Sequence, residues 1–430
     1  MGWRSNRLQQ LSIEQKYRPN IRSYFLLSGL RGAATGTPIV LWVVFLQQHY
    51  GYSLTEVTLL DLPFWLGIFL FEIPTGIVAD KYGRKLSLSL SAIIGCAIWL
   101  VFALSGDFLV MASAQFIGGL AVTFSSGADE ALLFETTKIL GREGEYAKIA
   151  GRARAIRTLS AMIAGLAVGA IASVDLVLPA FITSALIGAT LIPILSFKET
   201  RGVSQATAGK GQESKNPPYS QILRQAVAAL GEHATLRWAL AYLVVLGCVG
   251  FYVEVFLQPY TLAVGLPVVA LGVVMVGVQG MSIAGSLAVP AAQRSIGTDR
   301  LLLGVPLLLV LCLLLIGVAP AVPVLVLAAV AAFLFALTQP VLLAVIQGRV
   351  PDDARATVLS IQSLFATVFL TLTEPALGLL ADGFGVHTAY LAMSALVALL
   401  CGALILKGRS WLSSHAIRTE IAKPAVSNEG

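Results

Sequence analysis

Long apolar runs, each about as long as a bilayer is thick, dominate this sequence and restrict what it can fold into. We count twelve of them, six before and six after a polar stretch between Lys198 and Arg237. A helix needs about 20 apolar residues to cross the hydrocarbon core of a bilayer. Lipid offers no partner to unpaired backbone groups, so only helices and closed barrels span it. Because the runs are continuous and do not alternate with polar residues, they predict an all-α, multi-pass membrane protein.

The composition agrees, since 57% of the residues are hydrophobic, only 12% are charged and the mean hydropathy is +0.83. Soluble domains carry about a quarter charged residues. The first six helices are expected at residues 24–46, 54–79, 86–105, 108–138, 156–173 and 175–197. The second six are expected at residues 237–264, 267–292, 301–318, 322–347, 356–381 and 387–406. This division predicts five parts: an N-terminal arm (1–23), a six-helix bundle (24–197), a linker (198–236), a second six-helix bundle (237–406) and a tail (407–430).

The predicted linker is polar and contains a Pro217-Pro218 pair, as expected of a flexible connection. Within it, Ile222, Leu223, Ala226, Val227 and Leu230 recur at helical spacing. They indicate either an amphipathic helix on the membrane surface or a solvated turn.

Lysine and arginine are distributed unevenly between the loops. Counting span ends with their loops, all of the 29 Lys and Arg residues but Arg31 fall in the arm, the tail or the loops after even-numbered spans. Because short cytoplasmic loops are enriched in these residues, we expect both termini and the linker in the cytoplasm and the protein in the plasma or inner membrane. The opposite loops, which carry neither residue, lie near Gly51, Gly106, Val174, Gly265, Ala319 and Gly385.

The sequence offers little support for metal, cofactor or enzyme chemistry. All four histidines lie at or beyond the ends of the predicted spans, and no P-loop, HExxH or CxxC motif occurs. We therefore expect no cofactor, no metal, no enzymatic activity and no nucleic-acid partner. The four cysteines, which lie inside apolar runs without metal-ligand spacing and are interpreted as small core residues, are Cys96, Cys248, Cys312 and Cys401.

A dense polar segment at residues 76–85, GIVADKYGRK, separates the second and third spans. So much charge is too costly in hydrocarbon, so the segment must be a short loop at a membrane surface. Its pattern, G-x-x-x-D-[RK]-x-G-[RK]-[RK], resembles the signature loop of the major facilitator superfamily between helices 2 and 3. Residues 72–76 (EIPTG) and 125–132 (SSGADEAL) are similar to bacterial drug:proton antiporters of that superfamily. The loop at residues 293–300, QRSIGTDR, is a degenerate copy of the signature, which indicates two repeated halves.

The resemblance implies a major facilitator fold, with twelve helices in two pseudo-symmetric six-helix bundles that work by alternating access. Helices 1, 4, 7 and 10 would line a central cavity. Two departures are Gln115, where the family often has an arginine in helix 4, and residues 165–170, which lack the proline that drug antiporters carry in helix 5. The resemblance also implies a cytoplasmic gate in which Asp80, Arg84 and Glu135 form a charge relay. Its full residue set is Gly76, Asp80, Lys81, Gly83, Arg84, Lys85 and Glu135; the two glycines are expected to allow close helix approach and a tight turn respectively.

Charged residues inside the predicted spans are candidates for function, because a charge at the bilayer centre costs roughly 2.5–3.5 kcal/mol. Arg31, about 10 Å inside the first helix, is either part of a structural ion pair, a cavity cation that releases a carboxylate in one state, or a side chain that reaches the surface. Asp129 and Glu130 are adjacent in the fourth helix. Burial and a neighbouring carboxylate both favour a retained proton, so at least one of the two is expected to carry protons. The alternative is a structural pair with Arg31, which could hold at the same time.

Glu254, one helical turn before Gln258, is a third proton or substrate candidate, in the predicted cavity helix 7. Glu374 is ranked below it, and Asp61 and Glu72 are interpreted as structural. The polar residues that we expect to bind substrate by hydrogen bonds are Gln258, Tyr260, Gln279 and Gln339.

These features predict a secondary transporter that exports small amphiphilic molecules in exchange for protons and acts as a monomer among membrane lipids. Arg31, Asp129, Glu130 and Glu254 sum to a charge of about minus two, which favours cationic or neutral substrates. The alternatives are a proton symporter that imports a sugar or an organic ion, and a transporter-like receptor or lipid-handling protein without coupled flux.

Overall fold

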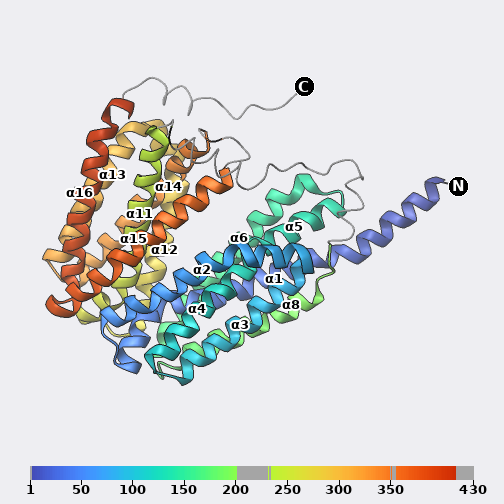
Figure 1. The fold of residues 1–430 in the computed structure, drawn as a ribbon, viewed down its shortest axis with the longest axis horizontal. Helices are drawn as coiled ribbons and strands as arrows, with labels where there is room; N and C mark the ends of the chain where they lie inside the picture. The colour runs from blue at the N-terminus through green and yellow to red at the C-terminus, as the bar shows by residue number, and fades with distance from the viewer. Residues whose placement is uncertain (1, 201–230, 232–233, 349, 351–354, 413–430) are drawn as a thin grey trace. The chain divides into compact units, whose positions relative to one another are not determined.

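The computed structural model describes residues 2–200, 231, 234–348, 350 and 355–412, and every regular element in these ranges is a helix (Figure 1). Twelve of the described helical stretches are long and apolar enough to cross a membrane. This confirms the predicted all-α membrane fold. The predicted amphipathic segment at residues 222–230 and most of the predicted tail lie outside the described residues.

The chain divides into two compact units. The first consists of Met1–Tyr52, Val57–Ser214 and Val268–Val273, and the second of Ser53–Glu56, Lys215–Pro267 and Val274–Gly430.

The first unit contains six membrane spans, two of which are broken. Its helices are α1 (Gly2–Tyr50), α2 (Leu54–Tyr82), α3 (Arg84–Leu104), α4 (Phe108–Ser125), α5 (Ala128–Ile139), η1 (Glu143–Glu145), α6 (Tyr146–Ala172), α7 (Leu178–Ala189) and α8 (Leu191–Ser196). The N-terminal arm predicted at residues 1–23 is helical in the structure, because α1 starts at Gly2 and continues into the first span. Buried Tyr17, Ile21 and Tyr24 explain this extension, since they repeat at helical spacing and pack against the unit.

The fourth span is not the continuous helix that we predicted. It is divided between α4 and α5 at Ser126 and Gly127, where Gly127 adopts a left-handed φ of 69°. Left-handed backbone is costly for any residue with a Cβ atom, so glycine suits this break. The break places Asp129 and Glu130 in the first turn of α5, where the helix dipole stabilises negative charge.

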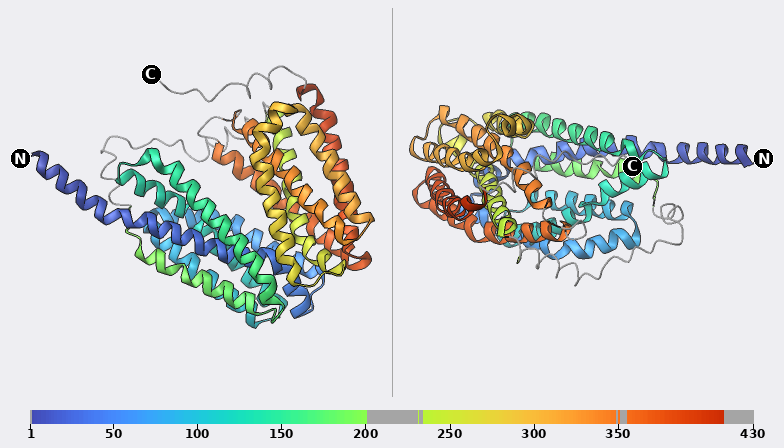
Figure 2. Two further views of the ribbon diagram at one scale, coloured as in Figure 1. Left: turned by 180° about the vertical axis from the view of Figure 1, so that it is seen from behind. Right: turned by 90° about the horizontal axis from the view of Figure 1, so that it is seen from above.

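Helices α1 and α6 run side by side through the first unit (Figures 1 and 2). A Cβ atom built on Gly32 would lie 2.1 Å from the Arg157 carbonyl oxygen, and one on Gly36 would lie 2.2 Å from that of Ala161. Glycine is therefore required for the backbones to approach this closely, as is typical of helix contacts in membranes.

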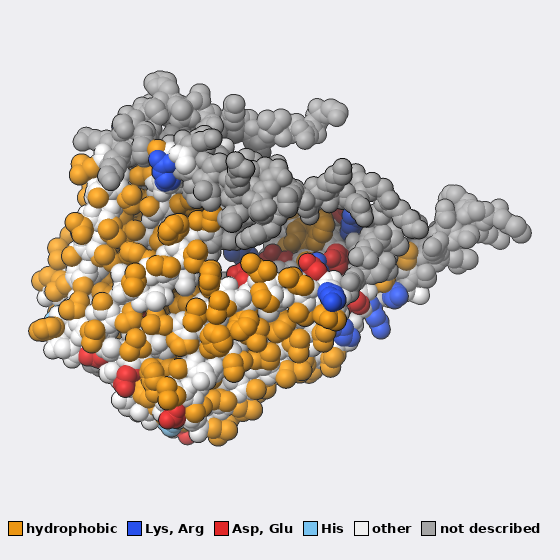
Figure 3. All heavy atoms as spheres, in the orientation of Figure 1, with side chains coloured by type: hydrophobic (Ala, Val, Ile, Leu, Met, Phe, Trp, Pro, Cys, Tyr) orange, Lys and Arg blue, Asp and Glu red, His pale blue; other side chains and the backbone are white. Residues whose placement is uncertain are grey.

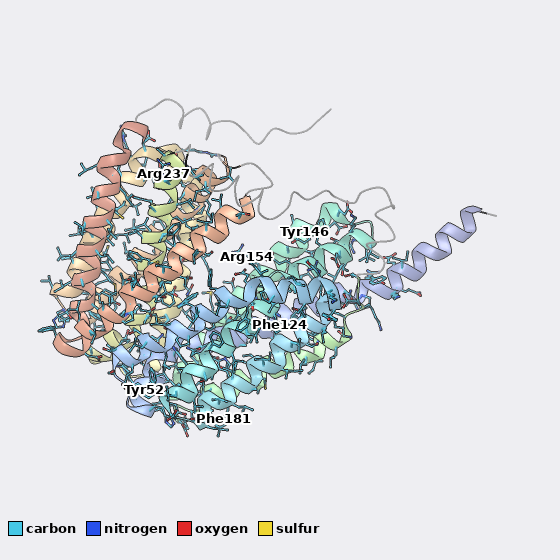
Figure 4. All side chains as sticks on the ribbon, in the orientation of Figure 1. Tyr52, Phe124, Tyr146, Arg154, Phe181 and Arg237 are labelled. Atoms are coloured by element: carbon cyan, nitrogen blue, oxygen red, sulfur yellow. The ribbon has the colours of Figure 1, made fainter. Side chains whose placement is uncertain are left out.

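A packed cluster joins five helices of the first unit near α5. It includes Leu27 of α1, Leu88 of α3, Leu132 of α5, Ile149 of α6 and Ile194 of α8. Tyr146, at the start of α6, lies at this end of the unit, whereas Tyr52 and Phe181 lie at the opposite end (Figure 4). The cluster holds α5, which carries the candidate carboxylates, against its neighbours.

The second unit contains the other six spans. Its helices are α11 (Ala234–Ala263), α12 (Val269–Ser295), α13 (Thr298–Val318), η2 (Val322–Val324), α14 (Leu325–Gln347), α15 (Arg355–Phe384) and α16 (Val386–Leu412). In the most apolar 18-residue stretch of α11, 72% of the residues are buried. This helix packs against α14, α15 and α16, so it is central to the unit. Buried tyrosines join the helices: Tyr260 donates to the Ile316 carbonyl at 2.7 Å, and Tyr390 to that of Val253.

The two halves share one backbone feature that supports the predicted repeat. Gly83, with φ 106° and ψ 151°, precedes α3, and Gly297, with φ 87° and ψ 149°, precedes α13. Both glycines occupy the same place in the signature loop and in its degenerate copy. Gly83 therefore forms the predicted tight turn.

Hydrophobic side chains cover most of the described surface in view in Figure 3. Leu109, Leu287 and Leu399, for example, are 74%, 77% and 70% exposed. Leucine at this exposure over both units is suited to contact with lipid.

Candidate functional site

Arg31 of α1 and Asp129 of α5 form an ion pair in the first unit, with 2.7 Å between Nη1 and Oδ2. Each side chain is only 13% exposed. Taking two charges out of water is costly, and their mutual attraction offsets that cost only while the pair is intact. The structure thus joins two predicted site residues that are 98 positions apart in sequence.

Glu130, next to Asp129, has a different environment. It is exposed within its unit, and among the described residues its carboxylate has no hydrogen-bond or ion-pair partner. Tyr24, Tyr146 and Arg157 lie within electrostatic range of this acidic pair or of Arg31. Arg157 was not among the sequence candidates, because it lies at the predicted membrane end of its helix.

In the second unit, Glu254 of α11 accepts a hydrogen bond of 3.1 Å from Gln279 Nε2 of α12. Both side chains are half-buried. A neutral amide can donate to an ionised carboxylate and can also accept from a protonated one through its carbonyl oxygen. This pair is therefore chemically suited to a carboxyl group that gains and loses a proton.

The other polar residues expected to contact substrate are dispersed. Gln258 and Tyr260 of α11 are buried, and the Tyr260 hydroxyl already donates to a backbone carbonyl of its own unit. Gln339 of α14 is exposed within its unit. The structure thus unites Gln279 with Glu254, whereas the Tyr260 hydroxyl bonds elsewhere in its unit and Gln339 is exposed.

The three charged side chains of the predicted relay lie together within the first unit. Arg84 Nη2 lies 3.2 Å from Glu135 Oε1 and 3.5 Å from Asp80 Oδ1. The side chains of Arg84 and Glu135 are 22% and 19% exposed, whereas that of Asp80 is 73% exposed. The Arg84–Glu135 pair is the stronger of the two contacts, because the exposed Asp80 carboxylate is screened by solvent.

The remaining loop residues have distinct surroundings. Lys85 Nζ donates to the Leu195 and Phe197 carbonyls at the end of α8, while Lys81 lies 5.4 Å from the ring centroid of Tyr82. A Cβ atom built on Gly76 would meet no heavy atom of the described residues within 4 Å. No neighbouring helix of the described residues lies close to Gly76, so the close helix approach expected there stays a prediction.

Sequence reasoning missed Asn20 and Thr200. Asn20 of α1 is 2% exposed and bonds to Thr136 of α5 and to the backbone of Lys198. Thr200 is fully buried and donates to Glu135 Oε2 at 2.5 Å. The helical spacing from Tyr17 onward could have identified Asn20, whereas Thr200 was assigned to a flexible linker.

Three further acidic residues in the spans occupy different environments. Asp61 of α2 is buried and accepts a hydrogen bond of 3.3 Å from Gln115 Nε2 of α4, so the glutamine in place of the family's arginine bonds to a carboxylate. Glu374 of α15 is fully buried. Glu72 of α2 is exposed within its unit.

Twelve helices long and apolar enough to cross a membrane, divided between two compact units, define a polytopic membrane protein. A family model described as Major Facilitator Superfamily matches residues 24–366. The chain therefore belongs to the major facilitator superfamily. It is also 27% identical over 107 residues to an uncharacterised MFS-type transporter, YxaM, of Bacillus subtilis (strain 168). That match spans 25% of this chain and 27% of the relative's length.

Solved transporters share the fold at low sequence identity. A mutant of the nucleoside transporter NupG has a TM-score of 0.76 and 15% identity over 90% of this chain and 99% of its own. A bacterial homologue of the human lysosomal transporter Spinster, in an inward-facing and unoccupied conformation, has a TM-score of 0.72 and 15% identity. The match covers 92% of this chain and 98% of the homologue. At this identity, the likeness establishes the fold.

Proposed function

We propose that this protein exports small amphiphilic molecules from the cytoplasm in exchange for protons, by alternating access. Its membership of a transporter superfamily supports transport of a small molecule. The proposal includes its action as a monomer in the cell membrane, with both termini in the cytoplasm.

The observation that carries proton coupling is the environment of Glu254. Its hydrogen-bond partner is the neutral amide of Gln279 at 3.1 Å. A fixed cation would favour the ionised carboxylate permanently, whereas an amide remains a partner in both protonation states. Glu254 can then take up a proton on one side of the membrane and release it on the other.

Asp129 is the second proton-coupling residue in this proposal. Protonation of its carboxylate would remove the counter-charge of Arg31 and break the 2.7 Å ion pair. Because Arg31 is largely buried, it would then need another partner. The cycle of pairing and release would couple proton uptake to a change in the first unit.

The candidate site residues Arg31, Asp129, Glu130 and Glu254 carry more negative than positive charge, which supports cationic or neutral substrates. Asp129 is neutralised by Arg31, and Glu130 and Glu254 have no basic partner among the described residues. An organic cation with an apolar body would complement these carboxylates, and protons would compete with it for the same groups.

A resistance panel in an efflux-deficient bacterial host tests the proposal. Cells with the parent chain should tolerate toxic organic cations that inhibit the host alone. Asp129→Asn, Glu130→Gln and Glu254→Gln should each reduce this tolerance, with Glu56→Gln as a control carboxylate near the start of α2. If all three variants behave like the parent on an exported compound, the proton sites have been assigned incorrectly.

The direction of coupling requires a second assay. In inverted vesicles with an acid lumen, addition of ethidium should make the lumen more alkaline if protons leave as the cation enters. Movement of proton and solute in the same direction would instead establish a symporter, and transport without proton movement would exclude coupling.

A further inference from the structure

The chain leaves the last helix of the first unit through residues 197–200, which we call the exit segment. The predicted linker begins inside it, at residue 198, but the described part is not a free connection. Each of its four residues bonds to a partner in α1, α3 or α5. Two of these partners, Lys85 and Glu135, belong to the predicted gate.

Asn20 holds the middle of the exit segment. Its amide nitrogen donates to the Lys198 carbonyl at 3.0 Å, and its amide oxygen accepts from the Lys198 backbone nitrogen at 2.9 Å. The same nitrogen lies 3.2 Å from Thr136 Oγ1, beside Glu135 on α5. Asn20 is 2% exposed, so loss of these bonds would leave buried polar groups without partners.

Glu199 lies over the turn before α3. Its Oε2 accepts from the Lys85 backbone nitrogen at 3.2 Å, in the first turn of α3. A Cβ atom on Gly83 would lie 2.9 Å from the same oxygen. Gly83 thus suits this turn through its positive φ, and the Glu199 carboxylate packs directly against it.

Thr200 completes the set by bonding to the charge relay itself. One oxygen of Glu135 accepts from Arg84 Nε at 3.2 Å, and the other accepts from the Thr200 hydroxyl at 2.5 Å. The carboxylate is therefore held from both sides. Its orientation toward Arg84 depends on the position of Thr200, and that position depends on Asn20 through Lys198.

We propose that Asn20 and Thr200 are positioning residues of the gate, which hold the Glu135 carboxylate in line with Arg84. When the Arg84–Glu135 pair opens, the Thr200 bond to Glu135 is lost as well. The exit segment is then released from α5. This inference rests on the gating role of the Asp80–Arg84–Glu135 relay, which is part of the alternating access in the proposed function.

We call the hydrogen bonds that Asn20 forms with Lys198 and that Thr200 forms with Glu135 the anchor. Hydrogen–deuterium exchange of the purified protein tests the anchor without a substrate. Thr200→Val removes the hydroxyl at nearly constant volume and should accelerate exchange in peptides covering residues 83–90 and 128–140 by about tenfold, as expected for loss of a hydrogen bond to a charged group. Thr200→Ser should restore the parent rate. Ser23→Ala is the matched control, because it removes a 2.7 Å bond between α1 and Ser196 of α8 outside the relay.

A double-mutant comparison separates positioning from general support. If Thr200 acts through Glu135, then Thr200→Val should add little to the exchange of a Glu135→Gln variant. Asn20→Ser offers a second route should Thr200→Val fail to fold, and should accelerate exchange in the same peptides. Full additivity in the Glu135→Gln background, or an effect of Ser23→Ala equal to that of Thr200→Val, would overturn the proposal.

Efflux of ethidium from loaded cells links the anchor to function. Thr200→Val should change the efflux rate and Thr200→Ser should not. If the exchange results match the prediction but the parent chain exports no ethidium, the anchor is supported and the export proposal is contradicted. Normal efflux together with parent-like exchange in Thr200→Val would contradict the anchor alone.

Discussion

At the scale of single residues, two adjacent carboxylates have been given different surroundings. Asp129 is paired with Arg31 and is largely buried, whereas Glu130 is exposed within its unit. The sequence alone left open which of the two would pair with Arg31, because neighbouring helix positions point about 100° apart. The start of α5 at Ala128 and its packing against α1 decide the matter.

We predict that Asp129→Asn destabilises the protein by about 3 kcal/mol, because it leaves Arg31 largely buried without its counter-charge. Glu130→Gln should stay within about 0.5 kcal/mol of the parent, as expected for an exposed substitution. Thermal unfolding in detergent measures both. Equal loss of stability in the two variants would contradict the assigned pairing.

At the scale of helices, glycines determine where spans break and how closely they pack. The left-handed Gly127 divides the fourth span, and Gly32 permits the contact between α1 and α6. The two positions make different demands. One requires an unusual backbone conformation, and the other requires the absence of a side chain.

Gly127→Ala should cost about 1–2 kcal/mol, the penalty of a left-handed conformation. A Cβ atom there would meet nothing within 4 Å, so no steric cost adds to it. Gly144→Ala, at a position with equally open space and no positive φ, is the control and should be near neutral. Chemical denaturation compares them, and equal effects would show that the backbone conformation does not matter.

Gly32→Ala should destabilise the first unit by about 1–3 kcal/mol, the usual cost of overpacking. The new Cβ atom would lie 2.1 Å from a backbone oxygen, so α1 and α6 must separate. Gly29→Ala, three residues earlier on the same helix, would meet Ile156 at an ordinary 3.5 Å and should be tolerated. Unfolding temperatures of the two variants in detergent provide the measurement.

At the scale of the whole molecule, the distribution of Lys and Arg predicts that both termini lie in the cytoplasm. A fluorescent protein that folds only in the cytoplasm should therefore be fluorescent when fused to the C-terminus. A phosphatase that is active only outside the cytoplasm should be inactive there and active when inserted near Gly106. The opposite pattern of reporters would reverse the topology.

The sequence by itself determined the membrane class, the twelve spans, the signature loop and the family. These follow from the length of apolar runs and from a local motif, both of which are written along the chain. The tertiary structure alone decided the pairing of Arg31 with Asp129, the break at Gly127 and the burial of Asn20 and Thr200. Hydrophobic periodicity carries no record of which distant residues meet, because contacts such as that of Thr200 with Glu135 form only when the helices pack.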